Sequence, residues 1–251
     1  MVAVRKTKTI KKKTVISKIM KKSLAVLKER HHAQKAQIKE RLAQFRQIPS
    51  EPVVWSYQHE RMKLIRTSAP AEQRLFEELA FCILAANTSA EMGMKTVDKL
   101  RHMMRRASPA EMTAAIRGSY RFINLRPEYI VHSRTYLQQL EVPLHELVGS
   151  FEDKHELRDF LADNTGIKGI GYKEASHFLR NVGIGGFAIL DKHIVNTMHE
   201  FGIVPTNKTP SSRKQYFELE QKYLEFSDKL GIHPDELDLL LWSRKTGKIL
   251  K

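Results

Sequence analysis

A glycine-rich turn at residues 166–173 (GIKGIGYK) constrains the fold more than any other stretch of this chain. Gly169 and Gly171 allow a tight backbone turn and a close approach to another backbone, and the apolar Ile170 lies between them. A helical pattern follows over residues 172–181, so the first amides of this helix point at the turn. Exposed amides at a helix N-terminus bind phosphate, which makes Gly169, Ile170 and Gly171 candidate contacts to a nucleic-acid backbone.

Two other phosphate-binding motifs do not fit this turn. The spacing differs from the G-x-x-x-x-G-K-[ST] pattern of a nucleotide-binding P-loop, and no strand pattern precedes it as in a dinucleotide-binding fold. The turn therefore predicts a helix-hairpin-helix motif. The alternative is a plain corner between two helices with a glycine turn.

The rest of the sequence predicts an all-α fold. Three predicted helices end at glycines suited to a left-handed C-terminal position, namely Gly202, Gly231 and Gly247. Only Phe187–Leu190 has the pattern of a strand, and it is too short to form a sheet. The predicted helices cover residues 23–46, 71–86, 127–136, 172–181, 191–201, 213–230 and 234–245.

The basic charge of the protein is concentrated near its N-terminus. Residues 1–50 contain 15 lysines and arginines but only two acids, so they carry +13 of the formal net charge of +15. Residues 1–22 contain little apolar surface and are predicted to be a disordered arm, followed by one helical domain over residues 23–251. Such an arm attracts phosphate in a salt-sensitive way. The alternative is a solvated arm without a dedicated partner.

Composition also excludes several classes of protein. No segment approaches the roughly 20 apolar residues that a membrane-spanning helix needs. The single cysteine, Cys82, excludes an internal disulfide and a cysteine-ligated iron–sulfur or zinc cluster. The pair His31 and His32 has no partner spacing for a metal. We therefore expect no metal, no cofactor and no membrane partner, and a monomer in the cytoplasm associated with the nucleoid.

Two ionisable residues stand at unusual positions around the turn. Lys173 falls in the first helical turn, where positive charge is disfavoured, and the same field with partial burial favours a neutral amine. A neutral amine can attack C1′ of a nucleoside and form a Schiff base. Asp191 follows 18 residues later at the start of another helix, where a fixed carboxylate can stabilise an oxocarbenium ion. The alternatives are a phosphate-binding lysine and an aspartate that only caps its helix.

With these residues in place, the chain resembles the helix-hairpin-helix DNA glycosylase superfamily, and most of all the second archaeal class of 8-oxoguanine DNA glycosylase/AP lyases. The resemblance extends over roughly residues 70–251 and does not cover the N-terminal arm. The stretch from 166 to 194 is the most specific, because the glycines, the lysine and the aspartate all agree. The carrying segments are FCILAANTSAEMG (81–93), YRFINLRPEYIVHSR (120–134), GIKGIGYKEASHFLRNVG (166–183), AILDKHI (188–194) and ELDLLLWSRKTGKILK (236–251).

The resemblance implies a two-lobed helical fold with the active site in the cleft between the lobes. It assigns the catalytic roles to Lys173 and Asp191. It implies an enzyme that extrudes 8-oxoguanine from double-stranded DNA, removes the base through a Schiff base, and nicks the strand 3′ to the abasic site by β-elimination. The branch of the superfamily that binds a cluster through four cysteines is excluded.

The resemblance places base recognition in the C-terminal segment, residues 234–251. It implies that Lys251 helps to recognise the oxidised base, because 8-oxoguanine carries a hydrogen on N7 where guanine has an acceptor. Asp238 is then expected to accept hydrogen bonds from the purine N1 and N2, and Trp242 to stack on the base. Without the resemblance, these three residues would be interpreted as a surface tail, an exposed helix and a core tryptophan.

The resemblance also suggests residues that replace the extruded base. Asn87 corresponds to the residue that enters the gap in the duplex, and Arg121 and Phe122 to the wedge that contacts the orphaned partner base. For Phe122, ordinary core packing is an equal alternative. His177 lies four residues after Lys173 and could share its helix face, although packing is the commoner role for such a histidine.

Two other functions compete with this one. The first is a glycosylase of the same fold that acts on a different damaged base. The second is a helix-hairpin-helix protein that binds DNA without catalysis, which leaves the joint occurrence of Lys173 and Asp191 unexplained.

Overall fold

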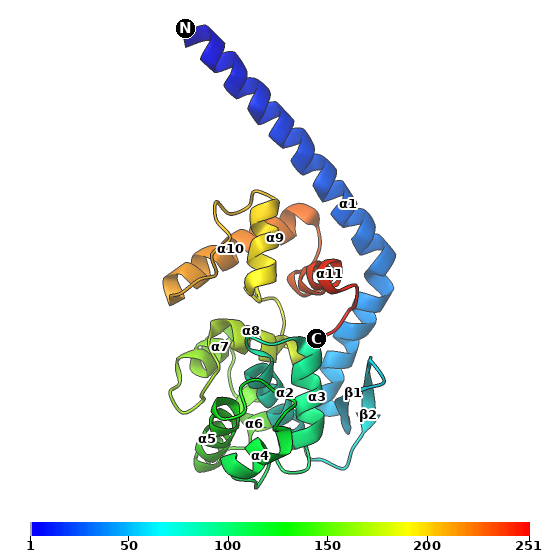
Figure 1. Ribbon diagram of the computed structural model, residues 1–251, viewed down its shortest axis with the longest axis vertical. Coiled ribbons are helices and arrows are strands. Elements are labelled where there is room, and N and C mark those ends of the chain that lie inside the picture. The colour runs from blue at the N-terminus through cyan, green and yellow to red at the C-terminus, as the bar shows by residue number, and fades with distance from the viewer. Residues whose placement is uncertain (1) are drawn as a thin grey trace. The chain divides into compact units, whose positions relative to one another are not determined.

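The computed structural model describes the backbone of residues 2–251 and the side chains of residues 24–251. Over this part of the chain the structure contains eleven helices and one two-stranded antiparallel sheet, so the predicted all-α class is confirmed (Figure 1). The elements are α1 (Val2–Ser50), β1 (Val53–Gln58), β2 (Arg61–Arg66), α2 (Ala71–Ala85), α3 (Ala90–Leu100), α4 (Pro109–Ile116), α5 (Leu125–Gln139), α6 (Leu144–Gly149), α7 (Lys154–Asp163), α8 (Tyr172–Asn181), α9 (Lys192–Glu200), α10 (Arg213–Leu230) and α11 (Pro234–Thr246).

The glycine stops of three helices are confirmed. Gly202, Gly231 and Gly247 follow α9, α10 and α11 with φ of 68°, 67° and 75°, the left-handed conformation that ends a helix at no steric cost. The start of α5 differs from the prediction, because this helix begins at Leu125 and Pro127 lies inside its first turn. Proline is tolerated there, since first-turn amides have no intrahelical partner.

The sequence-based strand prediction is wrong in both directions. Phe187–Leu190 belongs to no strand, whereas β1 and β2 form a hairpin that was not predicted. The hairpin turns at His59 and Glu60, which both adopt positive φ, 49° and 59°. Two-residue turns of this kind usually contain asparagine or glycine, so the sequence lacked the customary signal.

Helix α1 runs from Val2 to Ser50, and Pro49 lies in its last turn. The helix predicted over residues 23–46 is therefore part of a longer helix that ends next to Pro49. The side chains of residues 1–23 lie outside the described residues, and the disorder predicted for residues 1–22 stays a prediction.

The chain divides into two compact units, in agreement with the two lobes implied by the resemblance. One unit comprises residues 1–39 and 190–249, and the other comprises residues 40–189 together with residues 250–251. Each unit has its own set of helix contacts.

In the first unit, α11 packs against α9 and α10 and is bonded to α1. Arg30 Nη2 donates to the Ser243 carbonyl at 2.9 Å, and the Ser243 hydroxyl donates to Gln34 Oε1 at 2.7 Å. His31 Nε2 lies 2.6 Å from Glu236 Oε2, which explains one member of the histidine pair as part of an α1–α11 contact.

In the second unit, α2 is the central helix. Its residues from Arg74 to Ala85 are buried, and it contacts α3, α5, α6 and α8. Gly93 of α3 permits a close approach, because a Cβ at this position would lie 3.1 Å from the Ala85 side chain. The apolar second half of α2, from Leu79 to Ala85, thus packs in the core of this unit, while the buried charges Arg74, Glu77 and Glu78 lie in its first half.

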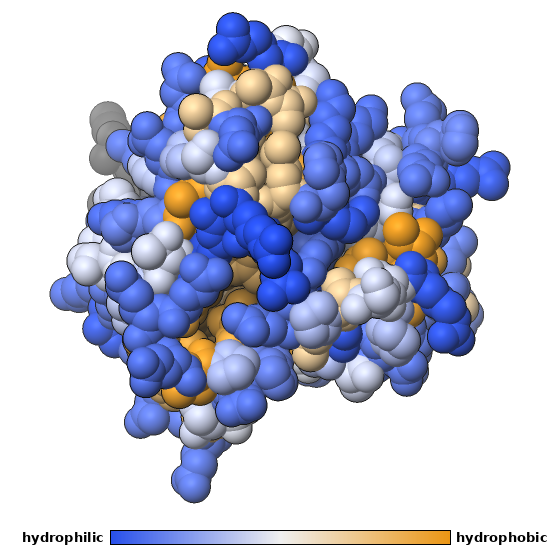
Figure 2. All heavy atoms as spheres, turned by 90° about the horizontal axis from the view of Figure 1, so that it is seen from below, coloured by the Kyte–Doolittle hydropathy of each residue, from blue (hydrophilic) through white to orange (hydrophobic). Residues whose placement is uncertain are grey.

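The surface is mainly hydrophilic. On the face shown in Figure 2, hydrophobic residues appear only in small separate patches. Among the described side chains, the exposed large hydrophobic residues are Val26, Leu125 and Val142. No helix of the described chain is long and apolar enough to cross a membrane.

Arg74 is buried in the core of the second unit and satisfies the end of α1. Its guanidinium donates to the carbonyls of Ile48, Pro49 and Ala69 at 2.9, 3.0 and 2.8 Å. We predict that Arg74→Leu lowers the free energy of unfolding by about 2–4 kcal/mol, because one buried and two partly buried carbonyls lose their donor. Urea denaturation measures this loss. Arg106→Leu, at an exposed arginine of the same unit, should change stability by less than about 0.5 kcal/mol, and equal effects would contradict the role of Arg74.

Candidate functional site

The predicted hairpin is present, and its glycines have distinct roles. Gly169 adopts φ of 77°, and a Cβ there would lie 2.6 Å from the ring of Tyr129. Ile170 is buried and anchors the turn. Gly171 is the N-terminal cap residue of α8 and contributes no side-chain cap to the helix. The amides of the first turn of α8 are therefore available for an anion such as a phosphate.

Helix α5 and the end of α7 hold the hairpin in place. The Gly166 amide donates to Asn164 Oδ1 at 2.8 Å, and Asn164 Nδ2 donates to the Tyr136 hydroxyl at 2.7 Å. The Lys168 amide donates to the Ser133 hydroxyl at 2.9 Å. These bonds fix the turn by side chains outside it, which the turn sequence did not indicate.

Lys173 lies in the first turn of α8, as predicted. Its side chain is half-buried, and its Nζ is 3.2 Å from Glu174 Oε1. Sequence reasoning missed Glu174. An amine next to a carboxylate at a phosphate-binding turn has a nearby acceptor for its proton, which nucleophilic attack requires it to lose.

His177 lies one turn after Lys173 and is buried. Its ring meets Phe81 of α2 edge to face, with ring centroids 5.5 Å apart. Neither ring nitrogen has a hydrogen-bond partner among the described residues. Burial lowers the pKa of His177 well below its usual range, and the cations Arg180, Lys173 and Lys251 lower it further. His177 is therefore a neutral packing residue that senses the charge of the lysine.

Asp191 caps α9. Its Oδ1 accepts hydrogen bonds from the amides of His193 and Ile194, both at 2.8 Å. The capping role expected from the sequence is therefore present. The bonds also fix the direction of the carboxylate relative to α9.

Helix α11 of the first unit carries Asp238 and Trp242, and Trp242 lies next to His193 of α9. Trp242 is half-buried on α11, and its ring lies 5.0 Å from that of His193 on α9. Asp238 lies one turn earlier on α11 and is only 1% exposed. Asp238 is thus no exposed helix residue. His193, which was not singled out, lies between the capped end of α9 and Trp242.

Lys251 does not have the environment that would be expected without the resemblance. It is no surface tail, because its residue is 8% exposed and belongs to the second unit. Its Nζ lies 2.7 and 2.8 Å from the two carboxylate oxygens of Glu78 on α2. Nothing in the sequence pointed to Glu78, because this acid sits within the apolar run of a core helix.

The expected gap-filling and wedge residues lie on two neighbouring loops of the second unit. Asn87 is exposed with φ of 61°, directly after α2. The Tyr120 hydroxyl donates to the Leu84 carbonyl at 2.7 Å, which joins the loop of Arg121 and Phe122 to the end of α2. Arg121 is exposed and Phe122 is half-buried, so the aromatic ring is neither a core residue nor fully in solvent.

Arg126 connects both loops to the hairpin and was missed by sequence reasoning. Its residue is 7% exposed, and its Nη2 donates to the Ala86 carbonyl at 3.3 Å. The guanidinium lies over the rings of Phe122 and Tyr129, at 5.3 and 5.6 Å. A Cβ on Gly169 would lie 3.3 Å from its Nη1. One buried cation thus touches the gap-filling loop, the wedge loop and the hairpin.

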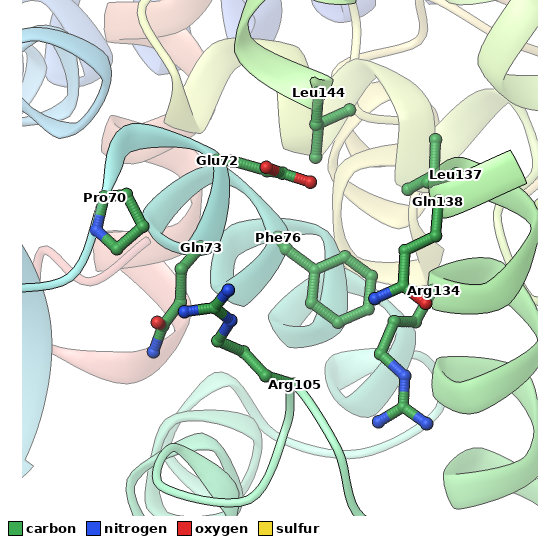
Figure 3. Close-up of a pocket in the computed structure, with 9 residues that line it drawn as sticks. All are labelled: Pro70, Glu72, Gln73, Phe76, Arg105, Arg134, Leu137, Gln138 and Leu144. Atoms are coloured by element: carbon green, nitrogen blue, oxygen red, sulfur yellow. The ribbon is translucent and has the colours of Figure 1, made fainter. Parts of the chain in front are cut away.

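A separate hollow of about 70 Å³ is lined mainly by α2 and α5 (Figure 3). Its walls include Phe76, Arg134 and Leu144, and none of the residues predicted from the sequence lines it. Ligand pockets usually enclose about 300–1,000 Å³. This hollow is therefore no candidate for holding a nucleobase.

The described side chains contain no group of three or more histidine, cysteine or acidic residues that could hold a metal ion. Cys82 is buried on α2, and burial raises the pKa of its thiol.

Comparison with known proteins identifies relatives across most of the chain. Residues 57–232 match the family model described as 8-oxoguanine DNA glycosylase. The 8-oxoguanine DNA glycosylase/AP lyase of Thermoplasma volcanium is 43% identical over 178 residues, which cover 70% of this chain and 82% of the relative. The protein of the same name from Methanocaldococcus jannaschii is 37% identical over 182 residues, covering 72% and 84%.

Solved structures agree with this result. The 8-oxoguanine DNA glycosylase of Thermotoga maritima aligns with a TM-score of 0.76 at 31% identity, covering 92% of this chain and all of the other. The M. jannaschii enzyme in complex with a 15mer DNA containing 8-oxoguanine aligns with a TM-score of 0.75 at 31% identity, covering 90% and 100%. The resemblance inferred from the motifs is confirmed.

His177 should make stability depend on pH. Its pKa is lowered in the folded protein, so below about pH 6.5 the unfolded chain takes up a proton that the folded protein does not. Stability should then fall by up to about 1.4 kcal/mol per pH unit as pH decreases. Urea titrations at several pH values should show that His177→Gln removes this contribution. His102→Gln, at an exposed histidine, should retain it, and an unchanged slope in His177→Gln would refute the assignment.

Arg126 should be essential to the second unit. We predict that Arg126→Met lowers the free energy of unfolding by about 2–4 kcal/mol, since its hydrogen bond and ring contacts are buried. Arg126→Lys should not restore stability, because an ammonium lacks the planar fork that serves both loops. Thermal and urea denaturation test both variants. Arg121→Met, an exposed arginine over the same Phe122 ring, should be nearly neutral. Full recovery by lysine would contradict this account.

Proposed function

This chain belongs to the 8-oxoguanine DNA glycosylase family, and from that premise we propose that it removes 8-oxoguanine from double-stranded DNA and nicks the resulting abasic site. The observation that carries the proposal is the position of Lys173, in the first turn of α8 directly after the hairpin and inside the matched region. The relatives' name, 8-oxoguanine DNA glycosylase/AP lyase, describes both steps.

The hairpin would hold the DNA backbone. The first-turn amides of α8 carry no side-chain cap, and the turn of Gly169, Ile170 and Gly171 brings them to the surface. A phosphate placed there gains from the amides and from the partial positive charge of the helix end. Such a contact positions the strand and does not read its sequence.

Lys173 would be the nucleophile. Its neutral amine forms a bond to C1′ while the bond from C1′ to the base breaks, and the base leaves with the bonding electron pair and takes up a proton. Opening of the sugar ring gives a Schiff base. Loss of a 2′ proton then breaks the C3′–O bond and releases the 3′ strand. Glu174, 3.2 Å from the amine, is placed to receive the proton that the ammonium loses first.

Asp191 would stabilise the positive charge that develops on the sugar. Its carboxylate is fixed by two amides of α9, so it costs little reorganisation when the charge appears. The same bonds leave its second oxygen, Oδ2, outside the cap.

Base recognition would use Trp242, Asp238 and Lys251. The half-buried indole offers a stacking face, and the buried carboxylate of Asp238 offers acceptors for the N1 and N2 hydrogens of the purine. The ammonium of Lys251 donates to Glu78 and can accept no hydrogen bond, so the N7 hydrogen of 8-oxoguanine would be accepted by a main-chain oxygen of this residue. Guanine lacks that hydrogen, and this difference would give the specificity.

Asn87, Arg121 and Phe122 would fill the space left by the extruded base and contact its partner. Their loops are joined at Tyr120 and Arg126, so they would enter the duplex together. A half-buried aromatic ring with an exposed arginine beside it suits an apolar gap lined by base acceptors. Action on chromosomal DNA would place the protein at the nucleoid, and the arrangement requires only a monomer.

A binding module without catalysis is not favoured, because the matched relatives are named glycosylase/AP lyases. The other competing function is a glycosylase of the same fold that acts on a different damaged base. Excision assays on a panel of duplexes that differ only in the damaged base distinguish the two.

Lys173→Gln tests the proposal most directly. The variant keeps the length of the side chain but cannot form a Schiff base, so we predict that borohydride trapping on 8-oxoguanine duplexes and strand nicking both fall by at least about a thousandfold. Binding of the same duplex, measured by fluorescence anisotropy, should change less than about threefold.

Lys168→Gln is the matched control, because Lys168 is an exposed lysine of the same turn. It should retain trapping and lose only some salt-sensitive affinity. If Lys173→Gln nicked DNA at the wild-type rate, another residue would be the nucleophile.

A further inference from the structure

Glu78 and Lys251 form a buried ion pair in the second unit. Lys251 Nζ lies 2.7 and 2.8 Å from Oε1 and Oε2 of Glu78, and the two side chains are 4% and 2% exposed, Glu78 first. Both carboxylate oxygens therefore hold one ammonium group, and water has almost no access to either charge.

The surrounding residues restrict the pair further. The Lys251 ammonium lies 4.1 Å from the ring centroid of Phe81 and 5.8 Å from that of Trp55. Asn181 Nδ2 donates to Glu78 Oε2 at 3.2 Å. The lysine head is therefore held by α2 and β1, and α8 holds the carboxylate of Glu78.

The pair is a poor device for stability alone. Removing two charges from water costs several kcal/mol per ion, and well-packed apolar side chains of similar volume often serve as well or better. Burial lowers the pKa of Lys251 despite the adjacent carboxylate, which reflects this cost. A buried ion pair joined by two hydrogen bonds does, however, define one position for both partners.

The course of the chain shows what needs to be positioned. Residues 244–248 are exposed, residues 249 and 250 are half-buried, and Lys251 alone is fully buried. The described contacts of Lys251 are made by its ammonium, on Glu78, Phe81 and Trp55. Its side chain thus anchors a segment that follows the end of α11 and carries the main-chain oxygens of residue 251.

We propose that Glu78 is a positioning residue for recognition of the oxidised base. By holding the Lys251 ammonium, Glu78 fixes the main-chain oxygens of residue 251 as acceptors for the N7 hydrogen of 8-oxoguanine. The inference rests on the proposed function and adds to it a residue outside the motifs. It predicts a defect confined to steps that need a base, because an abasic site has no N7 to recognise.

The test is a double-mutant cycle on the full chain with Glu78→Gln, Lys251→Ala and the double variant. Single-turnover rates are measured on an 8-oxoguanine duplex and on a duplex with a preformed abasic site. Each single variant should lower 8-oxoguanine excision by about tenfold or more, while nicking of the abasic site changes by less than about threefold. The double variant should excise 8-oxoguanine at least as fast as the less active single variant, because each single substitution already removes the same anchor.

Two features keep the test decisive. Either single variant leaves an uncompensated buried charge and lowers stability, whereas the double variant removes both charges and should fold at least as well as either. Glu77→Gln is the matched control, since Glu77 is the neighbouring buried acid and pairs with Arg101 at 2.8 Å instead of Lys251. Its ratio of 8-oxoguanine excision to abasic-site nicking should stay at the wild-type value.

The outcomes separate this inference from the proposed function. Equal loss on both substrates, additive losses in the double variant, or the same ratio change in Glu77→Gln would overturn the role of Glu78. If the wild-type protein did not excise 8-oxoguanine, the proposed function itself would fail. Wild-type excision with an unaltered ratio in Glu78→Gln would sink only the positioning role.

Discussion

The turn between α7 and α8 is the constraint on which the second unit depends. Gly169 adopts a left-handed conformation and lies against Tyr129. Gly171 leaves the N-terminus of α8 without a side-chain cap. Both properties follow from the absence of a side chain. The turn thereby fixes where α8 begins, and with it the position of Lys173 and of the amides that can meet a phosphate. A shift of one residue would rotate Lys173 by about 100° around the helix.

Behind this surface, α2 and α8 enclose polar groups in an apolar interior. Glu78 accepts hydrogen bonds from Lys251 and Asn181, whereas Asn181 Oδ1 and the ring nitrogens of His177 have no hydrogen-bond partner among the described residues. Such groups cost free energy when buried, so their presence beside Lys173 marks a place where position matters more than stability. The loops around Arg126 show the same preference for position over stability. Its buried guanidinium contacts three surface segments through a hydrogen bond to Ala86 and contacts with aromatic rings such as that of Phe122.

Local chemistry made much of this fold predictable. The glycine stops after α9, α10 and α11, the cap at Asp191 and the hairpin all depend on residues close together in the chain, and they were predicted. The hairpin of β1 and β2 was missed, because its turn at His59 and Glu60 carries no customary turn residue and its strands are stabilised by packing. Residues 187–190 were predicted as a strand from their apolar run, and this prediction was wrong. These apolar residues are buried without a strand partner.

The sequence by itself determined the helical class, the family, and the positions of the candidate nucleophile and carboxylate, since each rests on residue type and short spacing. Only the tertiary structure decided the partners of those residues. The contact of Lys251 with Glu78 joins positions 173 residues apart, and Arg126 reaches Ala86 across 40. Which distant groups meet depends on how helices pack, and packing depends on the shape of the whole core, which no local pattern records.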